Sequence, residues 1–195
     1  AQPGGMPEEP PENIAGETAT RAAFDPGAAG TRAEAVVDEL GDRYWQKTYG
    51  GTDAFECLVR TILSQNTSDV ASQPAHDALM ERYGGSGDLA ATLADAERSE
   101  LAETISSAGL YNRKSEVIVD AAGLIREAYG GAAAFNTFVR EDDPETVREA
   151  LLDIHGVGPK TADCVLLFAA GRDGVFPVDT HVHRIARRMG LASAD

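Results

Sequence analysis

The chain has 195 residues, 43% of them hydrophobic, which is enough to bury one substantial core. It carries 32 acidic residues against 17 Lys and Arg, a net charge of −15, and this argues against the basic surface that most nucleic-acid-binding proteins present. No apolar run approaches the roughly 18 residues that cross a bilayer, and no secretory signal pattern is found. We therefore expect a soluble, cytoplasmic protein with no membrane partner.

The balance of basic residues is unusual, because only three are lysines (Lys47, Lys114 and Lys160). An acidic chain so poor in lysine predicts a protein that works in a high-salt cytoplasm, where screening shortens electrostatic range to about 3 Å at 1 M. Under such conditions a global negative charge repels a polyanion only weakly. Cys57 and Cys164 lie within apolar patterns, which favours buried, reduced thiols over a disulfide.

The first 31 residues are rich in Pro, Gly and Glu and lack apolar periodicity, which predicts a flexible tail before a helical domain over 32–195. Apolar residues at helical spacing then predict one helix from Arg32 to Tyr44 and another over 55–63. Ser68 or Asp69 can cap a third helix that reaches about Tyr83.

The remainder of the chain continues the helical pattern. Gly130 and Gly131 end a long helix, Pro144 suits a first helical turn, and the carboxylate of Asp179 can cap the last helix. No segment alternates apolar and polar residues long enough to predict a strand, so the fold class is all-α. The helices expected here are one or two short ones within 88–107, then about 112–129, 144–152, 161–170 and 179–189.

Residues 151–168, LLDIHGVGPKTADCVLLF, form two predicted helices joined by a tight hairpin. Gly156 and Gly158 permit a sharp turn and a close approach of the backbone to another molecule. The free amides at the start of the second helix make a ready anion site, which a DNA phosphate fits without help from basic side chains. This hairpin therefore weakens the objection that the charge raises against a nucleic-acid partner.

The pattern from Gly156 to the end of the hairpin resembles the helix-hairpin-helix of the endonuclease III-type DNA glycosylases, here over residues 145–170. Three further segments agree with that family in order and spacing: ILSQNTSD at 62–69, GLYNRKSE at 109–116 and VDTHVHR at 178–184. The resemblance covers about residues 33–192. It implies an all-α six-helix glycosylase bundle and a monomeric, nucleoid-associated base-excision-repair enzyme with AP lyase activity. Such an enzyme removes oxidised pyrimidines from damaged double-stranded DNA.

The resemblance also implies roles for individual residues. Lys160 is the amine that attacks C1′ of the damaged nucleotide, and Asp179 is the catalytic carboxylate. Asn66, with Gln65 beside it, fills the gap that the flipped nucleotide leaves, and Leu110 wedges against the orphaned partner base. Further DNA contacts are implied for Gly156, Val157, Gly158, Thr161 and Arg184, and a monovalent cation is implied at the backbone carbonyls of Leu152, Ile154 and Val157.

The sequence also departs from this family. Relatives usually continue for several helices and end with four spaced cysteines around a four-iron, four-sulfur cluster. We therefore expect a second lobe that begins at 179 and is largely missing, no cofactor within this chain, and a cluster only where a longer parent supplies the cysteines.

Three alternatives stay open. The first is a glycosylase of the same superfamily that acts on mismatches or on 8-oxoguanine. The second is a non-catalytic helix-hairpin-helix DNA-binding module, against which Lys160 speaks because the matching lysine is the nucleophile in the lyase branch of the superfamily. The third is a structural helical protein with a coincidental hairpin.

Overall fold

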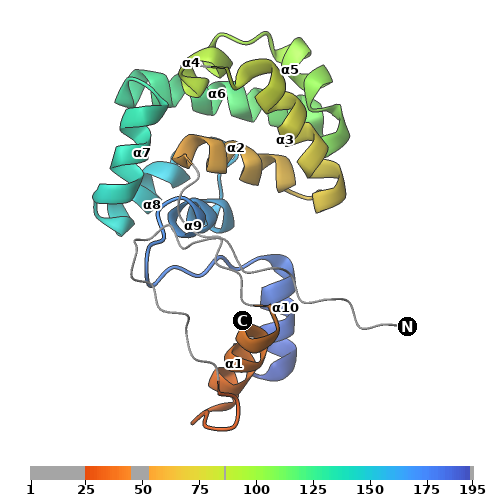
Figure 1. Cartoon of the computed structure of the whole chain (residues 1–195), viewed down its shortest axis with the longest axis vertical. Helices are drawn as coiled ribbons and strands as arrows, with labels where there is room; N and C mark the ends of the chain where they lie inside the picture. The colour runs from red at the N-terminus through yellow and green to blue at the C-terminus, as the bar shows by residue number, and fades with distance from the viewer. Residues whose placement is uncertain (1–24, 45–52, 86, 194–195) are drawn as a thin grey trace. The chain divides into compact units, whose positions relative to one another are not determined.

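The computed structural model describes residues 25–44, 53–85 and 87–193, and within them every regular element is a helix, which confirms the all-α prediction. None of these helices is long and apolar enough to span a membrane. The elements, labelled in Figure 1, are α1 (Arg32–Tyr44), α2 (Ala54–Ser64), α3 (Asp69–Tyr83), α4 (Leu89–Ala94), α5 (Arg98–Thr104), the 3₁₀ turn η1 (Ser106–Ala108), α6 (Tyr111–Tyr129), α7 (Ala132–Glu141), α8 (Pro144–Leu152), α9 (Pro159–Phe168) and α10 (Thr180–Met189).

The chain forms two compact units. One is Gly51–Pro177, which contains α2 to α9, and the other combines Ala1–Gly50 with Val178–Asp195 and contains α1 and α10. The flexible tail was predicted over residues 1–31. Residues 1–24 lie outside the described residues, and 25–31 contain a turn.

Helix α2 is the centre of the unit Gly51–Pro177, where it packs against α3, α4, α6, α7 and α9 (Figure 1). Its sequence is apolar around most of its circumference, and Glu56, Arg60 and Ser64 form one half-exposed polar stripe. Phe55, Leu58 and Ile62 are fully buried. Asp53 is the N-cap of α2: its Oδ1 accepts the backbone N–H groups of Phe55 and Glu56 and caps the first turn.

Helix α7, which the sequence pattern did not predict, follows α6 directly after two glycines. Its first N–H group, that of Ala132, donates to Asp88 Oδ2 at 2.7 Å, while Oδ1 of the same carboxylate caps α4 through Ala91 N. The N-cap of α7 is thus supplied by a residue far away in the chain, and local sequence carries no sign of it. Phe135 and Val139 bury the inner face of α7 in the core.

Most other helix limits agree with the predictions to within one or two residues. Ser68 does occupy the N-cap position of α3, but its side chain makes no capping hydrogen bond. The second hairpin helix begins at Pro159 and ends at Phe168, two residues earlier at each end than expected. Proline is favoured in the first helical turn because its missing N–H would have no partner there, and this explains the earlier start.

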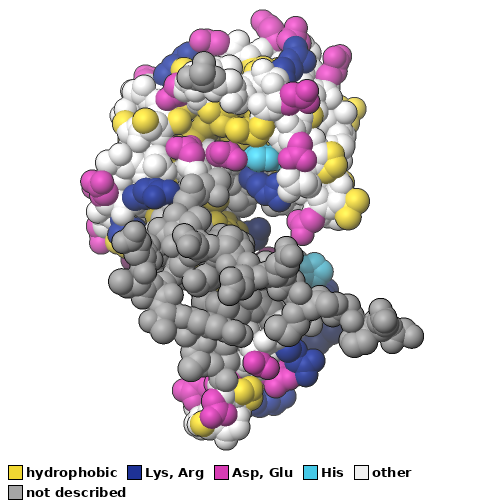
Figure 2. Space-filling model, viewed as in Figure 1, with side chains coloured by type: hydrophobic (Ala, Val, Ile, Leu, Met, Phe, Trp, Pro, Cys, Tyr) yellow, Lys and Arg dark blue, Asp and Glu magenta, His cyan; other side chains and the backbone are white. Residues whose placement is uncertain are grey.

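Acidic side chains are spread over the visible face of the molecule and are not gathered in one patch (Figure 2). Several are paired with arginines of neighbouring helices, as in Arg98–Asp120 and Arg126–Asp95, both at 2.7 Å. These pairs are exposed, and each is therefore expected to add little to stability.

Candidate DNA-binding and catalytic site

The predicted hairpin is present between α8 and α9, and the two helices pack against each other (Figure 1). Arg148 Nε on α8 donates to Asp163 Oδ1 on α9 at 2.7 Å, which ties the helices together and raises the pKa of Arg148. In the turn, Val157 N donates to the Ile154 carbonyl at 3.0 Å, and Gly156 has a φ of +84°. A side chain at Gly156 would place its Cβ only 2.7 Å from Val117 Cγ2.

Lys160 lies in the first turn of α9, immediately after Pro159, and is half-buried. The first-turn amides of a helix have no intrahelical acceptor and carry the positive end of the helix dipole. The hairpin therefore puts a primary amine beside a backbone site suited to an anion. Gly158, at the N-cap of α9, has no atom within 4 Å of where a Cβ would stand, so this approach is open.

The side chain of Gln65 joins the end of α2 to the hairpin. Its Nε2 donates to the Gly156 carbonyl and to Thr161 Oγ1, both at 3.1 Å, and Thr161 itself is buried. Both residues were predicted to contact DNA. In the structure their polar groups contact each other and the hairpin backbone, so they support the site from within the protein.

Asn66 and Leu110 lie on two separate loops, before α3 and before α6, and both are exposed. Leu110 has 63% of its surface exposed, so it is not a core residue. Among the described residues these two are the only non-glycine positions with positive φ, at +50° and +52°. That backbone region is costly for side chains with a Cβ and is often retained at functional sites.

The two loops and the hairpin meet at a small cavity of about 130 Å³. Residues from the end of α2, from the start of α6 and from the hairpin turn share it. The cavity is lined by Ile62, Gln65, Asn66, Leu110, Arg113, Lys114, Val117 and Gly156. The structure thus brings together three of the four sequence motifs within one unit.

Lys114 also lines this cavity, and the sequence predicted no role for it. It is only 4% exposed, and its ammonium donates three hydrogen bonds. A signal was available, because Lys114 precedes Val117, Ile118 and Ala121 on the spacing of one buried helical face.

Asp179 caps α10, as predicted, and its Oδ1 accepts the backbone N–H of Val182 at 2.7 Å. It belongs to the unit that contains α1 and α10, whereas Lys160 belongs to Gly51–Pro177. The pairing of the two side chains stays a prediction. Among the apolar residues of α10, Ile185 is exposed, and Val182 and Met189 are half-buried.

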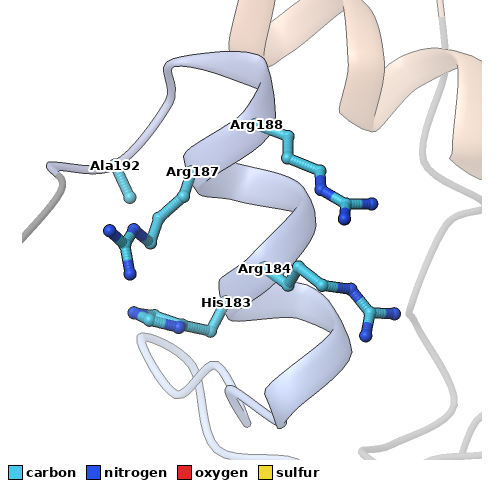
Figure 3. Close-up of a pocket in the computed structure, with 5 residues that line it drawn as sticks. All are labelled: His183, Arg184, Arg187, Arg188 and Ala192. Atoms are coloured by element: carbon cyan, nitrogen blue, oxygen red, sulfur yellow. The ribbon is translucent and has the colours of Figure 1, made fainter.

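Arginines of α10 line a shallow pocket of about 420 Å³ together with His183 and Ala192. Figure 3 shows His183 and Arg187 on one side of the helix and Arg184 and Arg188 on the other. An Arg184 terminal nitrogen lies 3.0 Å from His181 Nδ1. In a chain with a net charge of −15, this helix concentrates positive charge, and a contact of Arg184 with DNA stays a prediction.

No group of three or more His, Cys, Asp or Glu side chains suited to a metal ion occurs in the described ranges 25–44, 53–85 and 87–193. Cys57 and Cys164 are buried, and burial raises the pKa of the Cys57 thiol to about 12. Two buried thiols do not fit a cluster that needs four thiolates. The monovalent cation expected at the carbonyls of Leu152, Ile154 and Val157 stays a prediction.

Comparison with known proteins defines the class. A trapped covalent intermediate of endonuclease III with DNA superposes with a TM-score of 0.65 at 27% identity, over 82% of this chain and 68% of that one. The fold is thus the helical fold of the DNA glycosylases. A family model for HhH-GPD superfamily base excision DNA repair protein matches residues 59–195, and the chain belongs to this superfamily.

Curated relatives include endonuclease III proteins and other DNA glycosylases. Endonuclease III of Thermotoga maritima is 34% identical over 157 residues, which is 80% of this chain and 66% of that protein. The N-glycosylase/DNA lyase of Saccharomyces cerevisiae is 59% identical over 51 residues, 26% of this chain and 14% of that protein. The chain spans about two thirds or less of the length of the curated relatives it matches.

Proposed function

We propose that this protein is a DNA glycosylase with AP lyase activity that uses Lys160 as its nucleophile. The observation that carries the proposal is the position of Lys160 in the first turn of α9, directly after the glycine hairpin. A phosphate bound at the hairpin amides would hold the DNA backbone beside this amine. The similarity to a trapped covalent endonuclease III–DNA intermediate supports the same chemistry.

In the proposed reaction the damaged nucleotide leaves the stack and exposes C1′. The lone pair of Lys160 Nζ forms a bond to C1′ as the C1′–N bond to the base breaks, and the base departs with its electron pair and takes up a proton. The nitrogen loses its protons while the C1′–O4′ bond opens and O4′ is protonated, which leaves an imine. Removal of a C2′ proton then expels the 3′ phosphate by β-elimination, and water hydrolyses the imine.

Asp179 is assigned an electrostatic and proton-transferring role. A carboxylate near the sugar stabilises the positive charge that develops as the base leaves, and it can accept or return a proton. Its capping bond to Val182 N orients the carboxylate at the start of α10.

Oxidised pyrimidines are the proposed substrate class, by similarity to the endonuclease III relatives. Duplexes that contain thymine glycol, 8-oxoguanine or a mismatch separate this proposal from the other specificities of the superfamily. Preferential excision of thymine glycol supports it, and preferential excision of 8-oxoguanine or of a mismatched base contradicts the substrate class while leaving the lysine mechanism in place.

Borohydride trapping tests the mechanism. Incubation of the chain with abasic-site duplex and borohydride should give a covalent protein–DNA complex, because the reductant converts the imine to a stable amine. Lys160→Gln should abolish this complex, and Lys47→Gln, a control that alters a lysine outside the four motifs, should retain it. A complex that survives Lys160→Gln, or the absence of any complex with the unaltered chain, would contradict the assignment.

A further inference from the structure

The buried Lys114 connects the two loops that carry Asn66 and Leu110. Its Nζ donates to the carbonyl of Leu63 at 2.7 Å, to Thr67 Oγ1 at 2.7 Å and to the carbonyl of Ala108 at 2.6 Å. All three acceptors are uncharged, and together they use the three hydrogens of the ammonium. A buried cation without a charged partner is costly, so its presence calls for a role that an apolar residue would not fill.

The three acceptors lie at the bases of the two loops. Leu63 is in the last turn of α2 and Thr67 follows Asn66, whereas Ala108 ends η1 two residues before Leu110. Thr67 Oγ1 also lies 2.7 Å from the Ala108 carbonyl, within hydrogen-bond distance as a donor. One ammonium and one hydroxyl therefore join the two loops on the protein side of the cavity.

Each loop holds a non-glycine residue at positive φ, a backbone region that asparagine tolerates better than leucine. Leu110 is in left-handed conformation and is exposed, so its own side chain gives little packing to hold the strained backbone of its loop. Burial lowers the pKa of Lys114, while its three oxygen acceptors favour the charged form.

We propose that Lys114 is a positioning residue that fixes the loops of Asn66 and Leu110 relative to each other, so that both side chains enter the DNA duplex as one preformed unit. This inference rests on the proposed function. Opening a duplex requires unstacking, and a preformed wedge loses less conformational entropy on insertion than two independent loops. Lys114 acts through Asn66 and Leu110 and is not a second nucleophile.

The role predicts a dependence on DNA structure that general destabilisation would not produce. A wedge is needed when the abasic site lies in a duplex with a partner base, and it is not needed in single-stranded DNA. Lys114→Met keeps an unbranched side chain of similar length and removes all three hydrogen bonds. We expect it to lower kcat/KM on the duplex by about 100-fold, as small misplacements of aligned groups do, and to leave the single-stranded abasic substrate within about threefold.

Ile118→Ala is the matched control, since Ile118 is fully buried one turn further along α6 and contacts the core. It should destabilise the fold but retain the ratio of duplex to single-strand activity. Thr67→Val provides a second, milder variant that removes one acceptor, and Thr67→Ser should restore the ratio because it keeps the hydroxyl.

The outcomes are distinct. Equal losses on both substrates with Lys114→Met, or an unchanged ratio with Thr67→Val, would overturn the positioning role. Should Lys114→Met fail to fold, the Thr67 pair decides. If the unaltered chain forms no borohydride-trapped complex with either DNA, the proposed function itself has failed, which is a different result from a failure of the positioning role.

Discussion

At the scale of single residues, the two glycines of the hairpin are required for different reasons. Gly156 has a φ of +84°, and a Cβ there would lie 2.7 Å from Val117 Cγ2, so both its backbone and its surroundings exclude a side chain. Gly158 has a φ of −105° and open space around it. Its smallness matters for what approaches from outside, which in the proposed function is a phosphate.

We predict that Gly156→Ala destabilises the protein by about 2–4 kcal/mol, the sum of left-handed strain and of overpacking against Val117. Gly158→Ala should cost less than about 1 kcal/mol, yet weaken duplex binding because its methyl group lies in the path of the phosphate. Urea unfolding and a duplex titration measure the two effects. Equal losses of stability in the two variants would contradict this division of roles.

The burial of Lys114 can be predicted from the sequence, but its hydrogen-bond partners cannot. Its place on the apolar face of α6 predicts burial, but its three acceptors come from Leu63, Thr67 and Ala108, which two other segments contribute. Similarly, Gln65 reaches hairpin atoms that lie 91 and 96 residues away in the chain. The family resemblance assigned Gln65 to DNA, which stays a prediction; the structure adds that its amide nitrogen donates to the hairpin.

At the scale of elements, helices with a cap close in sequence were predicted well. Asp53, Asp143 and Asp179 each accept an N–H group two or three residues ahead, and α2, α8 and α10 begin where these residues indicate. Helix α7 has no such local cap, because its first N–H group bonds to Asp88, 44 residues earlier, and it was not predicted although Phe135, Phe138 and Val139 stand at helical spacing.

Asp179 combines a structural and a proposed chemical role, and substitutions at this position separate them. Asp179→Asn retains a good N-cap but removes the charge, so amide exchange at Val182 should stay near the wild-type rate while strand nicking is lost. Asp179→Ala should lose both, with exchange at Val182 faster by about fivefold for a cap worth ~1 kcal/mol. Hydrogen exchange and a nicking assay give the two readouts, and full nicking by Asp179→Asn would sink the catalytic assignment.

At the scale of the whole molecule, the charge of −15 stands beside a fold that belongs to a DNA-repair superfamily. Two local features suit an anion despite the net charge. The hairpin has free backbone amides at the start of α9, and α10 carries three arginines on one short helix. Neither feature requires a basic surface overall.

The net charge also predicts how stability depends on salt. Repulsion among the carboxylates acts over about 10 Å at 0.1 M salt and about 3 Å at 1 M, so added salt should stabilise the folded state. We expect the Tm to rise by about 3 °C, the equivalent of ~1 kcal/mol for a chain of this length, between these concentrations. Thermal unfolding in sodium, potassium and choline chlorides distinguishes screening from a specific cation effect. A Tm that is flat or falls with all three salts would show that repulsion is not the controlling factor.

The sequence by itself determined where most helices begin and end, the all-α class, the superfamily motifs and the candidate nucleophile Lys160, because caps, glycine breaks and apolar spacing act between residues within one or two helical turns. Only the tertiary structure decided that Asp88 starts α7, that Gln65 supports the hairpin from inside and that Lys114 joins two loops. Each of these depends on hydrogen bonds between segments distant in sequence, which form only after the chain has packed around α2.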